Sequence, residues 1–370
     1  MSVIDVKPVA LYELLARHWD LGAAVEGLAF DRSGGALAFA LADGRVAVAP
    51  VADAESPQAR YRVAADTGRA TLSPRRQPVP AIPQRVLDGA PLHIASLGES
   101  GFIAGGATGE VFRLMKGCLC DPLAQGPGPI EAMAPTANGG VVVASQGLLT
   151  AYEGMRGRAM SRYEGEVAAL AVAPDGSHLA IADARGLAVR AWADEPAPAA
   201  TLDVGTASAL CWSPDGHWLA VGLREGGLAL FHLESRKMLR IPNYPGPVGA
   251  LGWSADPRCL VTSGAYRIIV WSIAGIHGGG ERPENVETGR AGFVPVTAVG
   301  MHPRELRVAA GYADGQVVVA GIGSRDELVV KSPGQGAVRH LRWSHDGGHL
   351  GFGTDEGHAA IVTFPPHLFK

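Results

Sequence analysis

The sequence is poor in charge, in lysine and in cysteine. Of its 370 residues, 18% are charged and 47% are hydrophobic, which excludes an intrinsically disordered chain. Five lysines stand among the 32 basic residues, and the net charge is −4 with the basic residues spread along the chain. A surface that follows phosphates needs concentrated Lys and Arg, so no nucleic-acid partner is expected. The excess of arginine over lysine hints at a GC-rich bacterial source.

Targeting and membrane signals are also missing. Residues 1–20 lack a basic start followed by an apolar stretch and a cleavage site, and no apolar run approaches the length of about 18 residues that a membrane span needs. We therefore expect a cytoplasmic protein without membrane association. Four cysteines are too few for a disulfide framework in a chain of this size, so we expect reduced thiols at Cys118, Cys120, Cys211 and Cys259.

What the sequence does contain is an internal repeat. The unit ASALCWSPDGHWLAVGLREGGLALF, residues 207–231, has three short apolar runs separated by turns rich in Pro, Asp and Gly. Period-two alternation between such turns predicts β-strands, and no helical stripe competes with it. Further copies, two of them degenerate, span residues 25–51, 92–114, 130–152, 167–192, 248–271, 296–320 and 338–362.

The residue that closes the first strand of each unit gives the spacing. Intervals of 39, 40, 41, 48 and 42 residues separate the markers Met133, Val172, Trp212, Trp253, Met301 and Trp343. The marker near Ala95 lies 38 residues before Met133, and Phe30 lies a further 65 residues upstream, which places an insertion between the first two units. Repeats near this length are typical of propeller blades. We predict an all-β fold: a single closed β-propeller over residues 1–370 with four-stranded antiparallel blades. Eight blades are preferred; seven are the alternative if one degenerate unit belongs to an insertion.

The units resemble those of the WD-repeat family over nearly the whole chain. The segments VAPDG (172–176), WSPDG (212–216) and WSHDG (343–347) match the family's first turn, and Asp43-Gly44 and Asp314-Gly315 match its second. The resemblance implies a propeller, and the chain is identified as a divergent, bacterial-type member of the family.

The sequence also departs from the family pattern. Trp192 and Trp271 stand where the signature tryptophan closes the third strand, but Ala193 and Ser272 replace the aspartate that follows it. The family's Gly-His pair is largely absent, so its buried His–Asp network is not expected here. A separate set of tryptophans recurs at one repeat position and is expected to pack between blades: Trp212, Trp253 and Trp343.

Two segments lie outside the repeat. The last unit supplies three strands, so the N-terminal segment 1–24 is expected to close the ring through Leu14–Leu21, with a short helix as the alternative. The insertion at 65–90 contains SPRRQPVPAIPQR, whose four prolines favour polyproline II. This Pro/Arg-rich segment is either a docking segment for a partner or a surface loop between blades. A second, glycine-rich excursion spans Gly275–Glu284.

Motifs for catalysis, metals and nucleotides are weak. Cys118-Leu119-Cys120 is one residue short of a CxxC pair, and the glycine-rich segments 105–109 and 278–280 lack the helix that a phosphate cradle needs. Neither a GxSxG elbow nor an HExxH helix occurs. The last unit contains four histidines that are either surface residues or metal ligands: His340, His345, His349 and His358. We expect no enzyme, no cofactor and no metal.

The resemblance implies that a protein or peptide partner binds on one ring face, formed by the second turns and the links between units. Tyr and Arg anchor protein interfaces, which makes seven residues in these positions candidates: Tyr163, Arg185, Arg224, Tyr244, Tyr266, Tyr312 and Asp355. The leading hypothesis is a non-catalytic scaffold or adaptor. The alternatives are a lactonase- or esterase-like propeller hydrolase with a metal in the channel, and a metal-handling accessory protein that uses the histidines of the last unit.

Overall fold

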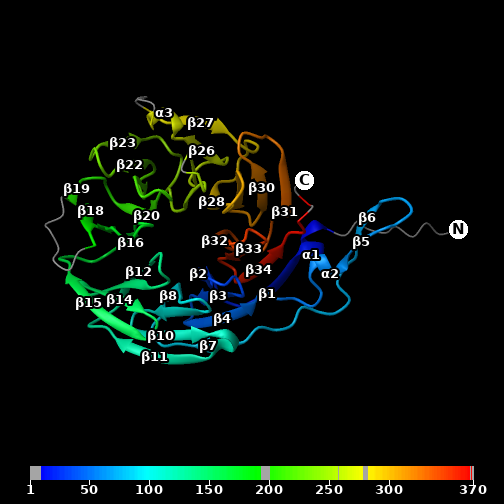
Figure 1. Cartoon of the computed structure of the whole chain (residues 1–370), viewed down its shortest axis with the longest axis horizontal. Coiled ribbons are helices and arrows are strands. Elements are labelled where there is room, and N and C mark those ends of the chain that lie inside the picture. Colours follow the sequence, from blue (N-terminus) through cyan, green and yellow to red (C-terminus); the bar gives the residue numbers. More distant parts are fainter. Residues whose placement is uncertain (1–9, 193–200, 257, 278–281, 367, 369–370) are drawn as a thin grey trace.

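Eight small sheets stand around a common axis in the computed structural model (Figure 1). The structure describes residues 10–192, 201–256, 258–277, 282–366 and 368. Within these residues, each of the eight sheets has four antiparallel strands that run in chain order from the centre to the rim, except in the last blade. The prediction of an all-β propeller with eight blades is confirmed.

The first four blades follow one another along the chain. Blade 1 contains β2 (Val25–Phe30), β3 (Ala36–Leu41), β4 (Arg45–Pro50) and β7 (Gln84–Val86). Blade 2 contains β8 (His93–Leu97), β9 (Gly101–Gly105), β10 (Glu110–Met115) and β11 (Cys120–Gln125), with the 3₁₀ turn η1 (Lys116–Cys118) before its last strand. Blade 3 contains β12 (Ile130–Pro135), β13 (Val141–Ser145), β14 (Leu148–Glu153) and β15 (Arg156–Arg162). Blade 4 contains β16 (Ala169–Val172), β17 (His178–Asp183), β18 (Gly186–Ala191) and β19 (Thr201–Leu202).

The other four blades complete the ring. Blade 5 contains β20 (Ala207–Trp212), β21 (Trp218–Leu223), β22 (Leu228–His232) and β23 (Met238–Ile241). Blade 6 contains β24 (Leu251–Trp253), β25 (Cys259–Thr262), β26 (Ile269–Ser272), the one-turn helix α3 (Ala274–His277) and β27 (Glu284–Glu287). Blade 7 contains β28 (Val296–Met301), β29 (Arg307–Tyr312), β30 (Val317–Gly321) and β31 (Glu327–Lys331). Blade 8 contains β32 (Val338–Trp343), β33 (His349–Thr354), β34 (His358–Thr363) and β1 (Ala16–Asp20).

The turn after the inner strand explains the Ser-x-Asp-Gly pattern that blades 5 and 8 share. In blade 5 the Ser213 hydroxyl accepts a hydrogen bond from the Trp218 amide at 2.9 Å and donates one to Asp215 at 2.5 Å. Ser344 makes the same pair of contacts in blade 8, with the His349 amide at 3.0 Å and Asp346 at 2.5 Å. The last turn residue has a positive φ, +74° at Gly216 in blade 5, which favours glycine because it lacks a Cβ.

The core lies between neighbouring blades, where the predicted tryptophans pack. Trp212 and Trp253 are buried, and Trp343 is half-buried. Each indole Nε1–H donates to a carbonyl on the inner strand of the preceding blade, at 3.0–3.1 Å for all three. A single blade cannot cover both faces of its sheet, so these contacts require a closed ring.

The ring is closed by the N-terminal segment. The helix α1 (Leu11–Leu15) comes first, and β1 then pairs antiparallel with β34, with Ala16 opposite Val362 and Asp20 opposite His358. The segment therefore contains both a helical turn and a strand, which the sequence left as alternatives. No helix in the described part of the chain is long and apolar enough to cross a membrane.

The boundaries predicted for the insertion, 65–90, were wrong. The insertion interrupts blade 1 between β4 and β7, so it covers residues 51–83, and residues 84–86 form the outer strand of that blade. It includes α2 (Pro57–Arg60) and a hairpin of β5 (Tyr61–Val63) and β6 (Ala70–Leu72) that projects from the rim (Figure 1). Strand geometry at 84–86 was missed because the proline-rich sequence before it favours an irregular chain.

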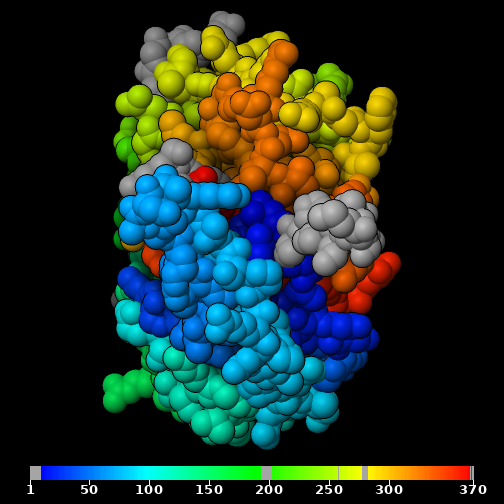
Figure 2. All heavy atoms as spheres, turned by 90° about the vertical axis from the view of Figure 1, so that its right-hand side faces the viewer, coloured from blue at the N-terminus to red at the C-terminus, as the bar shows by residue number. Residues whose placement is uncertain are grey.

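The insertion lies along the closing strand (Figure 2). The Trp19 indole donates to the Pro80 carbonyl at 2.8 Å, and Arg17 donates to the carbonyls of Pro50 and Val51 at 2.7 and 2.8 Å. Asp53 pairs with Arg75 at 2.5 Å and with Arg17 at 3.7 Å, all three side chains being largely buried. Desolvation acts to raise the pKa of Asp53, but the hydrogen bond from Arg75 and the nearby cations hold it below its usual value. The insertion thus fastens β1 to blade 1.

Candidate functional site

The propeller has two faces, and all seven predicted site residues lie at one of them. We call it the linker face, because it carries the links between blades and the turns between each second and third strand. The opposite face carries the turns that follow each first and third strand. The seven residues differ, however, in how much of each side chain is free to meet another molecule.

Tyr163 and Arg185 are tied together in blade 4. The buried Tyr163 hydroxyl donates to the Asp183 carboxylate at 2.9 Å, and the Arg185 Nε–H donates to the same oxygen at 2.8 Å. Burial and the bond to Asp183 raise the pKa of Tyr163. The guanidinium groups of Arg185 and Arg190 lie 5.5 and 4.9 Å from the Tyr163 ring centre. Tyr163 therefore stabilises the link between blades 3 and 4. Arg185 is exposed, whereas Tyr163 and Asp183 are buried.

Tyr244 holds together the linker-face end of blade 6. Its hydroxyl is 2.8 Å from the Thr262 hydroxyl and accepts a hydrogen bond from the Trp271 indole at 2.6 Å. Burial raises the pKa of Tyr244. Tyr244, Thr262 and Trp271 thus form a hydrogen-bonded network in this blade. The sequence departs from the family pattern that would supply a buried His–Asp network.

Tyr312 and Asp355 are also engaged within the fold. Tyr312 ends β29 and is buried, and this burial raises the pKa of its hydroxyl far above the usual value. The Asp355 carboxylate accepts a hydrogen bond from the Ala337 amide at 2.7 Å and lies 3.4 Å from the Arg339 guanidinium. Both side chains stabilise the linker face from within.

Tyr266 and Phe293 are both exposed on the linker face, in two segments that a backbone hydrogen bond joins, and the sequence analysis missed Phe293. Its side chain is 98% exposed and Tyr266 is 47% exposed. The amide of Gly292, next to Phe293, donates to the Tyr266 carbonyl at 3.0 Å, which joins the link after blade 6 to the turn within it. We call these two residues the aromatic patch. Arg224, in the equivalent turn of blade 5, is exposed as well.

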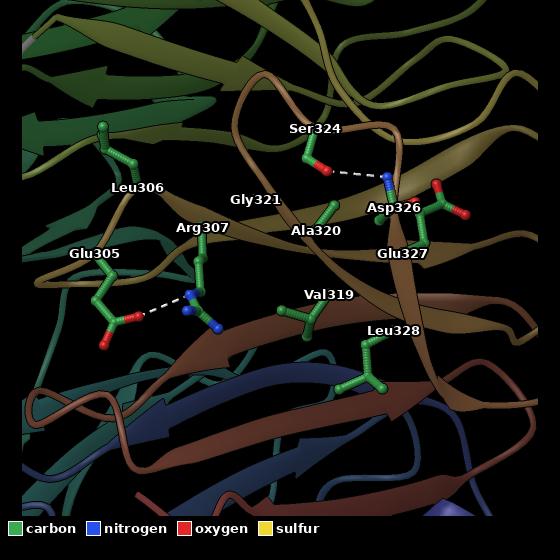
Figure 3. Close-up of a pocket in the computed structure, with 10 residues that line it drawn as sticks. All are labelled: Glu305, Leu306, Arg307, Val319, Ala320, Gly321, Ser324, Asp326, Glu327 and Leu328. Atoms are coloured by element: carbon green, nitrogen blue, oxygen red, sulfur yellow. Dashed lines mark hydrogen bonds and ion pairs between the residues drawn. The ribbon is translucent and has the colours of Figure 1, made fainter. Parts of the chain in front are cut away.

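The opposite face contains a cavity of about 600 Å³ beside blade 7 (Figure 3). Its lining includes Val319 and Leu328 and the charged side chains of Glu305, Arg307, Asp326 and Glu327. Glu305 pairs with Arg307 at 2.7 Å, and the Glu327 carboxylate accepts the Arg290 amide at 2.7 Å. Two of the three carboxylates are therefore engaged in the fold. A second, smaller cavity of about 230 Å³ lies between blades 3 and 4 and includes Tyr152 and Trp192.

The histidines of the last unit are dispersed over blade 8. His358 is buried and lies 2.6 Å from the Tyr12 hydroxyl, His349 lies 3.0 Å from the Thr363 hydroxyl, and His345 is exposed in a turn. Desolvation lowers the pKa of both His340 and His358 to about 4. In the described ranges, no group of three or more His, Cys, Asp or Glu side chains has a geometry that could hold a metal ion.

The described cysteines are free thiols, and burial raises the pKa of all four, to about 11 for Cys118 and Cys211. A raised pKa disfavours the thiolate that a nucleophile needs. Among the inner strands, Glu131 is engaged with the amides of Gln146 and Val167 at 3.1 and 3.0 Å. Both oxygens of the Glu131 carboxylate therefore accept hydrogen bonds from backbone amides.

Comparison with known proteins agrees with the architecture. Residues 198–256, which include blade 5, match the family model of the anaphase-promoting complex subunit 4 WD40 domain. No curated protein matches the sequence.

Three solved structures illustrate the shared fold. A chain of a mitotic checkpoint complex has a TM-score of 0.59 at 14% identity and covers 98% of this chain and 95% of its own. The C-terminal WD40 domain of Sif2 has a TM-score of 0.62 at 11% identity, over 94% and 98%. The computationally designed Ika8 protein has a TM-score of 0.66 at 18% identity, over 93% and 98%. The fold is therefore that of a β-propeller. Residues 198–256 carry the match to a WD40 family model, and the solved structures that share the fold include WD40 propellers.

Proposed function

We propose that this protein is a non-catalytic scaffold whose linker face binds a segment of a partner protein at the aromatic patch. WD40 propellers serve mostly as protein-interaction platforms, and eight blades of one ring account for most of the described residues. The observation that carries the proposal is Phe293, which is 98% exposed in a segment hydrogen-bonded to the turn that holds the half-exposed Tyr266. A large aromatic left in water contributes nothing to the fold but stabilises a complex when it is covered.

Exposed arginines near this edge of the face fit the same function. Arg224 and Arg290 are exposed on the linker face, and arginine adds charge-assisted hydrogen bonds to the contact area of an aromatic residue. Of the seven residues predicted from the sequence, we therefore keep Tyr266, Arg224 and Arg185 as proposed contacts. The free thiols favour a reducing compartment, and we propose a cytoplasmic location.

The proposal is tested by quantitative affinity capture from native extract with the wild type and three variants. F293S and Y266S remove the aromatic patch, and L306S removes a leucine that is 54% exposed in blade 7 on the opposite face. Covering one aromatic side chain contributes about 1.5–3 kcal/mol, so F293S should reduce recovery of the specific partner about 10- to 100-fold. L306S should leave recovery unchanged. Equal recovery with F293S and L306S, or turnover of a substrate without any reproducible partner, would contradict the proposal.

A further inference from the structure

The cavity between blades 3 and 4 has an acidic rim. It has a volume of about 230 Å³ and lies on the opposite face, where the turn after β12 and the end of β14 meet the first turn of blade 4. Among the described residues that line this cavity, two carry a charge: Glu153 from blade 3 and Asp175 from blade 4. Both are acidic and exposed, so the mouth of the cavity is negative.

Apolar side chains form a further part of the lining: Ala151, Val172 and Trp192, each of them half-buried. Trp192 follows β18 and packs against the core between blades 3 and 4. The ring of Tyr152, the other aromatic residue at the cavity, belongs to the core between blades 2 and 3, where a Cβ at Gly157 would lie 2.7 Å from it. The indole of Trp192 is therefore the aromatic surface of the cavity, and the face of an indole attracts cations.

Each carboxylate at the rim is held through one of its two oxygens. Oδ1 of Asp175 accepts hydrogen bonds from the amide and the hydroxyl of Ser177 at 2.9 and 2.6 Å. Oε1 of Glu153 accepts one from the side-chain amide of Asn138 at 3.3 Å. The hydrogen bonds from Ser177 lower the pKa of Asp175, which keeps this group ionised at neutral pH.

The other oxygen of each carboxylate is available to a ligand. Within the part of the chain that the structure describes, Oδ2 of Asp175 and Oε2 of Glu153 have no hydrogen-bond partner, and neither carboxylate has an ion pair. A cation with N–H donors would form charge-assisted hydrogen bonds with these oxygens. Two carboxylates are too few for a divalent metal ion, which takes six or more oxygen ligands.

We propose that this cavity binds a primary alkylammonium ion, with its ammonium group at Glu153 and Asp175 and its hydrocarbon tail against Trp192. An ammonium group has three N–H donors and no acceptor, which matches a rim of carboxylate oxygens. The tail covers the apolar part of the lining, and the small volume limits it to a few carbons. The ammonium group comes either from a free amine or from a lysine side chain of another protein. This site is separate from the linker-face contact proposed above.

The test measures binding of butylammonium chloride to the full chain by saturation-transfer NMR, with butanol as a probe that has the same tail and no charge. Butylammonium should bind the wild type at millimolar concentration, and butanol should bind more weakly. E153Q and D175N should each raise the Kd of butylammonium about 10-fold, because each removes a charge-assisted hydrogen bond. W192L should raise it about 3- to 30-fold through loss of the cation–π contact. D215N changes the equivalent turn of blade 5, away from the cavity, and should leave the Kd unchanged.

Glu153 is exposed at the end of its strand, so E153Q remains a folded test even if D175N weakens its turn. A second arm uses Nα-acetyl-lysine methylamide, which has the ammonium group on a peptide-like backbone. Binding of this probe as tight as that of butylammonium supports a lysine of another protein as the ligand, and binding of butylammonium alone supports a free amine. The proposal is overturned if butylammonium gives no saturation transfer with the wild type. It is equally overturned if butanol binds as tightly, or if E153Q binds butylammonium as the wild type does.

Discussion

Blade 5 and blade 8 complete the same four-stranded sheet in different ways. All four strands of blade 5 come from residues 207–241, whereas blade 8 joins residues 338–363 to Ala16–Asp20 from the other end of the chain. The first turns of the two blades share the same serine and aspartate contacts. Blade 8 additionally receives contacts from the insertion, at Arg17 and Trp19 of its outer strand.

The difference shows what ring closure requires. In blade 5 the outer strand follows its neighbour after a short turn, so little chain entropy opposes its pairing. In blade 8 the outer strand β1 and its neighbour β34 come from opposite ends of the chain, so their pairing closes a loop of most of the chain and costs more entropy. Without this pairing, β34 would present an open edge. The buried Arg17–Asp53–Arg75 cluster lies at this joint. The insertion, for which the sequence left a docking segment and a surface loop between blades as alternatives, has a structural role here.

The largest effect should come from removing the closing strand. A chain that starts at Leu21 lacks β1, so the edge of β34 is exposed and the contacts of the buried Leu15 and Trp19 are lost. We expect loss of cooperative unfolding and aggregation, measured by thermal denaturation and size-exclusion chromatography. The matched control replaces residues 64–69, the exposed tip of the β5–β6 hairpin, with Asn-Gly and should change stability by less than about 0.5 kcal/mol. If the truncated chain is monomeric and still unfolds cooperatively, blade 8 does not depend on its outer strand, and the proposed difference between blades 5 and 8 is wrong.

The ion cluster at the joint gives the next largest effect. D53N removes the carboxylate that pairs with the largely buried guanidinium of Arg17 and leaves Arg75 with only the more distant Glu55, at 3.9 Å, which should cost about 3 kcal/mol in urea unfolding. The comparison is D43N in blade 1, where Asp43 pairs with Arg45 at 2.6 Å with 41% and 27% of the two side chains exposed. That surface pair should contribute less than about 1 kcal/mol. Equal losses for the two variants would mean that the cluster does not fasten the closing strand.

Acid should weaken the closure through His358. Burial holds its pKa at about 4 in the folded protein, below the usual value of 6.5, so the folded state favours the neutral ring. The stabilisation is complete above pH 6.5 and is lost as the pH falls toward 4, by about 3 kcal/mol over that interval. His18, Lys331, Asp20 and the Tyr12 hydroxyl face this ring. H358Q should flatten the fall in unfolding free energy between pH 7 and pH 4.5, and an unchanged slope would assign the acid sensitivity to other groups.

The smallest effect should be the same in both blades. S213A in blade 5 and S344A in blade 8 each remove a hydroxyl that accepts a turn amide and donates to an aspartate. Each substitution should cost about 1–2 kcal/mol, because a buried amide loses its acceptor. Urea unfolding of the two variants should agree within experimental error. A much larger loss for S344A would show that the turn, and not the insertion, distinguishes blade 8.

The sequence predicted the ring because every blade repeats the same physical requirements. Alternating apolar residues located six of the inner strands, and a Ser-x-Asp-Gly turn follows two of them, in blades 5 and 8. In the two degenerate units the predicted markers near Ala95 and at Met133 stand two residues before the observed strand ends, Leu97 and Pro135. In blade 3 the strand ends at Pro135, which looked like the start of a turn.

The candidate site was harder to predict than the fold. Tyr163, Tyr244 and Tyr312 were chosen for their residue type and position, but each is engaged or buried within the linker face. Phe293 was missed because an apolar residue in an irregular link cannot be assigned to core or surface from period-two alternation. The surrounding sequence, AGFVPV, gave one usable signal: glycine and proline on either side hold the segment away from a strand.

The most direct test of the account places a photo-crosslinking amino acid at position 293 and, in a second protein, at position 306 on the opposite face. Both sites are exposed in blade 7 or its preceding link, so neither substitution should disturb the fold. The account predicts that position 293 forms a covalent adduct with one partner protein and that position 306 does not. Adducts of equal yield from both positions, or from position 306 alone, would contradict it.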